Sequence, residues 1–260
     1  MSTNLTVLEV PAGNRIHDIV PVLQRMIDGQ GPPLLPVPAG DDREIRRLTD
    51  ALHPGESIDD TVGLVLATSG TTGTPKGAQL TPAALRAGGN ATHERIGGTG
   101  TWLLALPAHH IAGMQVLLRS ILSGTEPVIV DVSDGFDPAT LPAAVEAMRG
   151  PRRYSSMVPT QLIKTLDHPD ALAALAELDA ILLGGAATPE PVLRRAREAG
   201  VNVVRTYGMS ETCGGCVYDG VPLTGVDVQI DADTVCGSAA RCSHPATADS
   251  PTIRRSPNRL

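Results

Sequence analysis

Residues 68–77, Thr-Ser-Gly-Thr-Thr-Gly-Thr-Pro-Lys-Gly, have the composition of a loop that holds a polyanion. Glycine lets the backbone approach a ligand closely, and hydroxyls together with an ammonium group supply the donors that a phosphate chain needs. The loop differs from a Walker A loop, because Lys76 lies between Pro75 and Gly77 rather than before Ser or Thr. A flexible linker is the alternative, but the preceding apolar run favours a binding loop. The candidate phosphate-binding residues are Thr68, Ser69, Gly70, Thr71, Thr72, Gly73, Thr74 and Lys76.

A second candidate group is the run Tyr207, Gly208, Met209, Ser210 and Glu211. A tyrosine face can stack on a base and a serine hydroxyl can bind a phosphate. A carboxylate can hold Mg²⁺, which ATP sites commonly bind with one or two carboxylates and phosphate oxygens. Alone, the run is equally well interpreted as a turn with a solvated glutamate; beside the Thr/Gly loop we prefer a nucleotide site.

Two weaker groups follow other apolar runs. Gly184, Gly185 and Ala186 offer bare backbone against which a planar group can lie. His109 and His110 stand at a predicted strand-to-helix turn, where one of them could line an acyl pocket. A hydrogen-bonded structural role is an equally weighted alternative for the histidine pair.

These residues are spaced along alternating strand-like and helix-like runs. The predicted strands are 62–67, 102–106, 127–131, 154–158, 178–183 and 201–205, and the predicted helices are 20–27, 41–52, 82–96, 112–122, 138–148, 160–166 and 189–199. Such alternation predicts an α/β fold with mostly parallel sheets flanked by helices. Ligands bind beyond the carboxyl ends of the strands in such sheets, and each candidate group follows a predicted strand. The sequence therefore predicts that all of them share one sheet edge.

The composition bounds the class of protein. The chain has 260 residues, 42% of them hydrophobic, which is enough for a sizeable core. Its net charge of −7 argues against nucleic acid as a partner, and its apolar runs are too interrupted for membrane insertion. No secretory signal is apparent at the N-terminus, so a cytoplasmic location is expected. Composition leaves the oligomeric state open, a homo-oligomer included.

Together, residues 68–77, 107–113, 184–186 and 207–211 resemble the successive core motifs of the AMP-forming adenylating enzymes, a superfamily that includes the acyl-CoA synthetases. The order and spacing match from about residue 5 to about residue 231. Residues 157–162 and the short N-terminal region are more similar to the o-succinylbenzoate-CoA ligases of menaquinone biosynthesis, in their actinobacterial form, than to the long-chain or acetate enzymes.

The resemblance implies a fold, a reaction and a role for each matching residue. The fold is the large N-terminal domain of these enzymes. In the reaction that the resemblance implies, an aromatic carboxylate attacks the α-phosphate of Mg-ATP to give an acyl-adenylate and pyrophosphate. The thiol of coenzyme A then attacks the acyl-adenylate to give a thioester and AMP. Lys76, with Thr68, Ser69, Thr71 and Thr72, would hold the β- and γ-phosphates. Gly184, Gly185 and Tyr207 would pack against the adenine. Ser210 would contact the α-phosphate and Glu211 would bind Mg²⁺. His110 would contact the acyl group.

The resemblance stops at about Asp233. Relatives continue with a carboxylate for the ribose and a small C-terminal domain that carries a lysine for adenylation. We therefore expect residues 1–234 to form an incomplete AMP-binding domain, and residues 235–260, rich in Ser, Ala, Pro and Arg, to be a disordered, unrelated tail. Activity is then expected to be impaired, and an inactive nucleotide-binding remnant is the alternative.

A zinc site is the competing hypothesis from a different class. Cys213 and Cys216 have the C-x₂-C spacing of zinc ligands, and His244 follows in the sequence. The spacing of the other two cysteines, Cys236 and Cys242, is irregular, which makes this alternative the weaker one.

Overall fold

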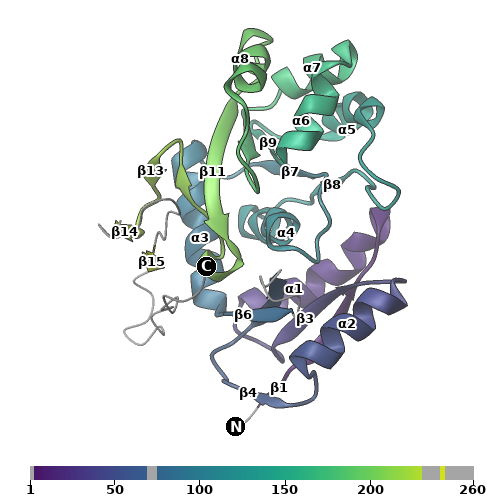
Figure 1. Ribbon diagram of the computed structural model, residues 1–260, viewed down its shortest axis with the longest axis vertical. Helices are drawn as coiled ribbons and strands as arrows, with labels where there is room; N and C mark the ends of the chain where they lie inside the picture. Colours follow the sequence, from purple (N-terminus) through teal and green to yellow (C-terminus); the bar gives the residue numbers. More distant parts are fainter. Residues whose placement is uncertain (1–2, 69–74, 230–240, 244–260) are drawn as a thin grey trace, which may run out of the picture.

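The computed structural model describes residues 3–68, 75–229 and 241–243, and two separate sheets dominate it (Figure 1). The smaller sheet has the strand order β2-β3-β5-β6. Its first three strands are parallel and β6 is antiparallel to β5. The bounds are Thr6–Val10 for β2, Leu34–Pro38 for β3, Leu64–Thr68 for β5 and Lys76–Leu80 for β6, and β1 (Thr3–Asn4) pairs with β4 (Ser57–Ile58) beside it.

The larger sheet has seven strands in the order β13-β12-β11-β10-β9-β7-β8. The five strands β11, β10, β9, β7 and β8 run parallel to one another. Strands β12 and β13 lie beyond β11 at one end of the sheet, and their pairings are antiparallel. The bounds are Thr101–Leu104 for β7, Val128–Ile129 for β8, Arg153–Met157 for β9, Ala180–Leu183 for β10, Val203–Met209 for β11, Gly214–Tyr218 for β12 and Val221–Pro222 for β13.

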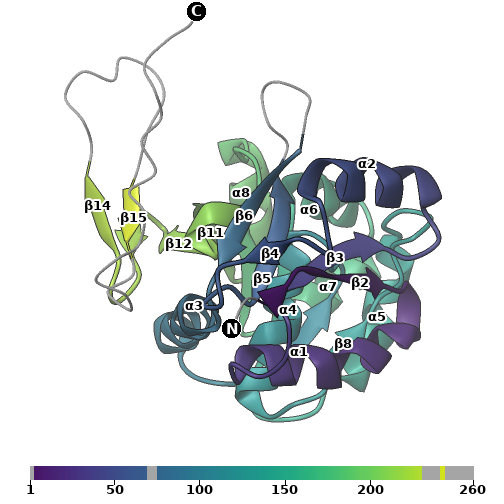
Figure 2. The same cartoon turned by 90° about the horizontal axis from the view of Figure 1, so that it is seen from below.

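Helices lie in three layers around the two sheets (Figures 1 and 2). The main apolar core includes residues of both sheets together with α1, α3 and α4, so these three helices are packed between the sheets. A second core joins the far face of the larger sheet to α5–α8, and a third joins the smaller sheet to α2. The bounds are Val20–Ile27 for α1, Asp42–Leu52 for α2, Pro82–Ile96 for α3, Ile111–Ser123 for α4, Leu141–Ala147 for α5, Pro159–Leu166 for α6, Pro169–Ala176 for α7 and Glu190–Glu198 for α8; short 3₁₀ helices span Gly13–Ile19 (η1), Pro138–Thr140 (η2) and Ser210–Thr212 (η3).

Local sequence signals explain where several helices begin. The Asp41 carboxylate accepts a hydrogen bond from the Glu44 amide at 2.9 Å and caps α2. Thr81 caps α3 in the same way through the Ala84 amide at 3.1 Å, with Pro82 at the first helical position. The predicted α/β class is confirmed, and the helices predicted at 20–27 and 82–96 have those bounds in the structure.

The structure differs from the expectations in four details. Residues 68–77 do not join a strand directly to a helix, because β6 follows first and pairs with β5 as a hairpin. Helix α7 was not predicted, and Tyr207 lies inside β11 rather than in a turn after it. Of the tail predicted at 235–260, residues 241–243 form β15 (Arg241–Ser243), which pairs with β14 (Asp227–Gln229); the rest lies outside the described residues.

Within the described ranges, none of the helices combines the length and the apolar character needed to cross a membrane.

Candidate active site

The candidate residues converge from two sheets rather than one. His109 and His110 follow β7, Gly184 follows β10, and Tyr207 lies near the end of β11, so these groups share the carboxyl edge of the larger sheet. The Thr/Gly loop belongs to the smaller sheet, so the prediction of a single sheet edge was wrong. The two parts meet because β5 and β6 both contact η3, the 3₁₀ turn that carries Ser210 and Glu211.

The mouth of the β5–β6 hairpin places Thr68 directly opposite Lys76. The Thr68 hydroxyl donates to the Lys76 carbonyl at 3.3 Å. Beside them, a Cβ on Gly77 would lie 2.7 Å from Val65 Cγ1, so a side chain there would disturb the hairpin. The Lys76 side chain is exposed and has no ion pair with any described residue. The other predicted loop residues, Ser69, Gly70, Thr71, Thr72, Gly73 and Thr74, lie outside the described residues.

A tight turn presents Ser210 and Glu211. The Thr212 hydroxyl accepts from the Met209 amide at 2.9 Å and lies 2.7 Å from the Gly214 carbonyl, to which it donates. The register between β11 and β12 shifts at Gly208, where a Cβ would overlap the Gly214 carbonyl oxygen. Ser210 and Glu211 are half-buried, and the Glu211 carboxylate has no hydrogen bond or ion pair within the described part of the chain. A carboxylate left without a partner near an exposed lysine suits a phosphate-bound Mg²⁺.

The residues that follow β10, Gly184 to Ala186, have small side chains or none and so leave the backbone uncovered. Gly184 is packed so closely that a Cβ would overlap the Thr206 hydroxyl, and Gly185 has a φ of +84°, which favours glycine. Gly185 and Ala186 are exposed. On the neighbouring strand Tyr207 is 38% exposed, an unusual degree for a tyrosine in this chain, whose Tyr154 and Tyr218 are fully buried. An exposed ring near the end of one strand and bare backbone at the end of the neighbouring strand can hold a planar base.

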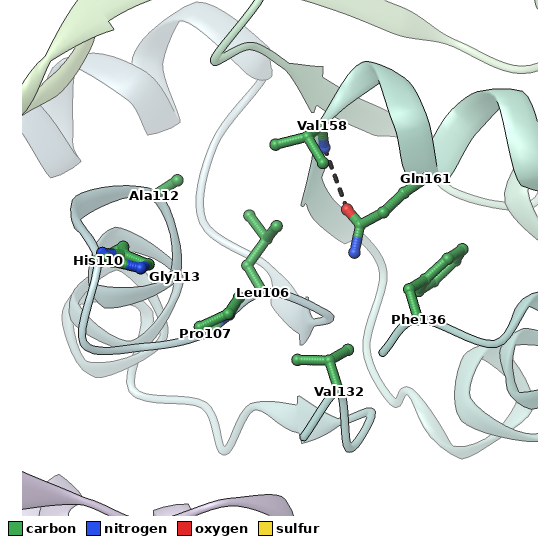
Figure 3. A pocket seen from close by; sticks show the side chains of 9 residues that line it. All are labelled: Leu106, Pro107, His110, Ala112, Gly113, Val132, Phe136, Val158 and Gln161. Carbon is green, nitrogen blue, oxygen red and sulfur yellow. Dashed lines mark hydrogen bonds between the residues drawn. The ribbon is translucent and has the colours of Figure 1, made fainter. Parts of the chain in front are cut away.

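His110 lines a cavity of about 320 Å³ at the end of β7 (Figure 3). Its walls come from the N-terminus of α4, from the loop after β8 and from the start of α6. Gln161 is the polar group on the far side: its amide donates to the Ala105 carbonyl at 2.6 Å and accepts from the Val158 amide at 3.1 Å. The lining residues are Leu106, Pro107, His110, Ala112, Gly113, Val132, Phe136, Val158 and Gln161, most of them apolar.

The surroundings of both histidines lower their pKa values. Their rings lie 4.1 Å apart. Burial, followed by repulsion from His110, lowers the pKa of His109 from 6.5 to about 4, although the carboxylates of Glu44 and Asp41 oppose the shift. Burial likewise lowers the pKa of His110. A neutral imidazole can donate or accept a hydrogen bond without neutralising a carboxylate beside it.

The predicted zinc ligands stand in an unfavourable setting. Cys213 and Cys216 are buried, and burial raises the pKa of the Cys213 thiol to about 12. Zinc binds the thiolate, so a thiol that keeps its proton is a poor ligand. The described residues contain no group of three or more His, Cys, Asp or Glu side chains arranged to hold a metal ion; Cys236 and His244 lie outside them.

Several residues of the site were not predicted. Phe136 and Val132 reach the cavity from the loop after β8, and no local pattern marks that loop as part of a site. The role of Thr212 is predictable from the sequence, because a threonine three residues after Met209 can accept a hydrogen bond from the Met209 amide and so close a turn.

Comparison with known proteins places this geometry in a family. The model of the AMP-binding enzyme family matches residues 18–258. A probable 2-succinylbenzoate–CoA ligase of Mycobacterium tuberculosis is 54% identical over 223 residues, which cover 86% of this chain and 57% of the relative. The chain therefore spans a little over half the length of that curated relative.

Two solved structures share the fold. The o-succinylbenzoate CoA synthetase from Bacillus subtilis in complex with ATP and magnesium ion is 26% identical, with a TM-score of 0.62, over 90% of this chain and 55% of that chain. The same enzyme in complex with its acyl-adenylate intermediate is 24% identical, with a TM-score of 0.68, over 99% and 63%. The resemblance inferred from the motifs is confirmed, and so is the fold. Since the family model covers most of its length, the chain belongs to the AMP-binding enzyme family.

Proposed function

We propose that this chain binds Mg-ATP and activates a carboxylate, as part of an AMP-forming 2-succinylbenzoate–CoA ligase. The contact of the β5–β6 hairpin with η3 carries the proposal, because it brings an exposed lysine and an unpartnered glutamate to one place. A cation for phosphate and a carboxylate for Mg²⁺ are both needed at a nucleoside triphosphate. The 54% identity to the mycobacterial ligase supports the substrate assignment.

The roles follow the geometry. Lys76 and the Thr/Gly loop would hold the β- and γ-phosphates, and Ser210 would contact the α-phosphate. Glu211 would hold Mg²⁺, which offsets phosphate charge during the displacement. The adenine would lie between Tyr207 and the bare backbone at Gly184, with Gly185, Ala186 and Gly208 close by. Catalysis of this kind depends on positioning and charge neutralisation, without a protein nucleophile.

The cavity beside His110 suits the acyl group. Its volume of about 320 Å³ and its mainly apolar walls fit an aromatic ring, and Gln161 adds a polar wall. The neutral His110 would donate a hydrogen bond near the carboxylate and leave it ionised, which is the form that attacks phosphorus. Coenzyme A is proposed as the second substrate and the cytoplasm, which supplies both ATP and coenzyme A, as the location.

Pyrophosphate release tests the proposal. The full chain is incubated with Mg-ATP, with and without 2-succinylbenzoate, beside Lys76→Ala. Lys164→Ala is the matched control, because Lys164 is the other lysine of the chain and lies exposed on α6. We expect substrate-dependent release that is lost in Lys76→Ala and kept in Lys164→Ala.

Two outcomes would contradict the proposal in different ways. If the chain binds Mg-ATP but releases no pyrophosphate, it binds the nucleotide without adenylating a substrate. That result would support the alternative function, an inactive nucleotide-binding remnant. Equal pyrophosphate release from Lys76→Ala and the unaltered chain would show that the hairpin is not part of the site.

A further inference from the structure

Helix α4 reaches both the cavity and the η3 turn. At its N-terminus, His110, Ala112 and Gly113 line the cavity. One turn further along, the side-chain amide of Gln115 donates a hydrogen bond to the Cys213 carbonyl at 2.6 Å. Cys213 directly follows η3 and has a φ of +57°, so its carbonyl belongs to the strained end of the turn.

The contact between α4 and this turn is tightly packed. Gln115 is 1% exposed. A Cβ on Gly214 would lie 3.3 Å from Gln115 Cγ and 3.6 Å from Ile111 Cγ1. The Gly214 carbonyl oxygen lies against Gly208, where the register shift occurs. Because interiors of this density do not deform continuously, the position of α4 and the shape of the turn are linked.

Packing alone does not explain a glutamine at position 115, because its buried polar atoms lower the stability of the fold. Its Oε1 has no hydrogen-bond partner among the described residues, although the atom is buried. A buried, unpartnered polar atom lowers the stability of the fold, and an apolar side chain of similar size would avoid that cost. The hydrogen bond to Cys213 is what distinguishes Gln115 from such a side chain.

We infer that Gln115 is a positioning residue for the Mg²⁺ and phosphate contacts. By fixing the Cys213 carbonyl, it holds η3 so that Ser210 and Glu211 face the hairpin mouth at Lys76. The inference rests on the proposed Mg-ATP site. It assigns to α4 a function beyond lining the acyl cavity, since the same helix sets the geometry of the turn that binds the metal.

In this account, Gln115 affects the binding of ATP more strongly with Mg²⁺ than without it. Losing one net hydrogen bond of about 0.5–1.5 kcal/mol from the turn weakens the Mg²⁺ contact by up to about tenfold. Binding of ATP without Mg²⁺ depends mainly on the hairpin and on the adenine contacts, which Gln115 does not touch. Of the η3 contacts it keeps only that of Ser210 to the α-phosphate, so this affinity should fall less than the affinity for Mg-ATP. A general loss of packing would lower both affinities together.

The test measures ATP affinity of the full chain by calorimetry, with Mg²⁺ and with EDTA, and the Mg²⁺ concentration that gives half-maximal ATP binding. Gln115→Met keeps the volume and removes the donor. Gln115→Leu also removes the donor and leaves no unpartnered oxygen. Ser120→Ala is the matched control, because among the described residues its buried hydroxyl bonds only to the Val116 carbonyl, within α4. Near-ultraviolet circular dichroism of Trp102, the single tryptophan, verifies folding of each variant.

We expect the Mg²⁺ midpoint to rise several-fold in both Gln115 variants, up to the tenfold limit, with a smaller loss of ATP affinity in EDTA and no change in Ser120→Ala. An unchanged midpoint overturns the inference while leaving the proposed function intact, and so does an equal loss of affinity with and without Mg²⁺. If the unaltered chain shows no Mg²⁺-dependent ATP binding, the proposed function fails and the inference fails with it.

Discussion

Acid should destabilise the fold in part through the buried histidine His93. Its side chain lies in the core between α3 and α4, 5% exposed. Its Nε2 accepts from the Trp102 indole at 3.3 Å. Burial, and secondarily the charge of Arg119, lowers the pKa of His93 from 6.5 to about 4.

The sign and size follow from linkage. Above pH 6.5 the ring is neutral in both states and has no pH effect. As the pH falls below 6.5 the unfolded chain takes up a proton that the folded chain refuses, so the free energy of unfolding decreases until about pH 4. The full decrease is about 3 kcal/mol, at about 1.4 kcal/mol for each pH unit, and about 2 kcal/mol of it is reached by pH 5.

Urea unfolding followed by Trp102 fluorescence at pH 7.5 and pH 5 measures the effect. His93→Gln keeps an acceptor for the indole but cannot take up a proton, so its loss of stability between the two pH values should be smaller by about 2 kcal/mol. His168→Gln, at an exposed histidine, is the control and should match the unaltered chain. Identical pH dependence in His93→Gln and the unaltered chain would refute the reasoning.

Two further substitutions test the local geometry. Gly208→Ala would place a methyl group on the Gly214 carbonyl, so we expect a loss of about 1–3 kcal/mol in urea unfolding together with weaker Mg-ATP binding; unchanged stability would show that the strands separate freely there. Asp41→Ala removes the cap of α2 and should cost about 1 kcal/mol, whereas Asp41→Asn, which keeps an acceptor, should cost little; equal losses would mean that charge rather than capping matters.

Local signals predicted much of the fold. Thr81 and Pro82 mark the start of α3 through capping and a fixed φ, effects that act within one turn of chain. Helix α7 was overlooked although Pro169 offers the same kind of start, because the preceding helix ends only three residues earlier. Strand β6 alternates buried Ala78 and Leu80 with exposed neighbours, a two-residue period that the glycine-rich stretch before it obscured.

The candidate site was predicted in its parts but not in its assembly. The rule that a motif follows a strand placed His110 and Gly184 correctly, whereas Tyr207 lies within β11, near its end. The meeting of the β5–β6 hairpin with η3 depends on how two sheets pack across α1, α3 and α4, and no short stretch of sequence encodes it. Gln115 was missed for the same reason, since its partner Cys213 is far away in the sequence.

The most direct test of the central claim is a comparison of Lys76→Ala and Glu211→Gln in ATP titrations with Mg²⁺ and with EDTA. If the hairpin and η3 form one Mg-ATP site, Lys76→Ala weakens ATP binding in both conditions by about tenfold or more, since hydrogen bonds to charged groups contribute about 1.5–3 kcal/mol. Glu211→Gln should weaken it only when Mg²⁺ is present. Equal ATP affinity of both variants and the unaltered chain, with and without Mg²⁺, would contradict the account.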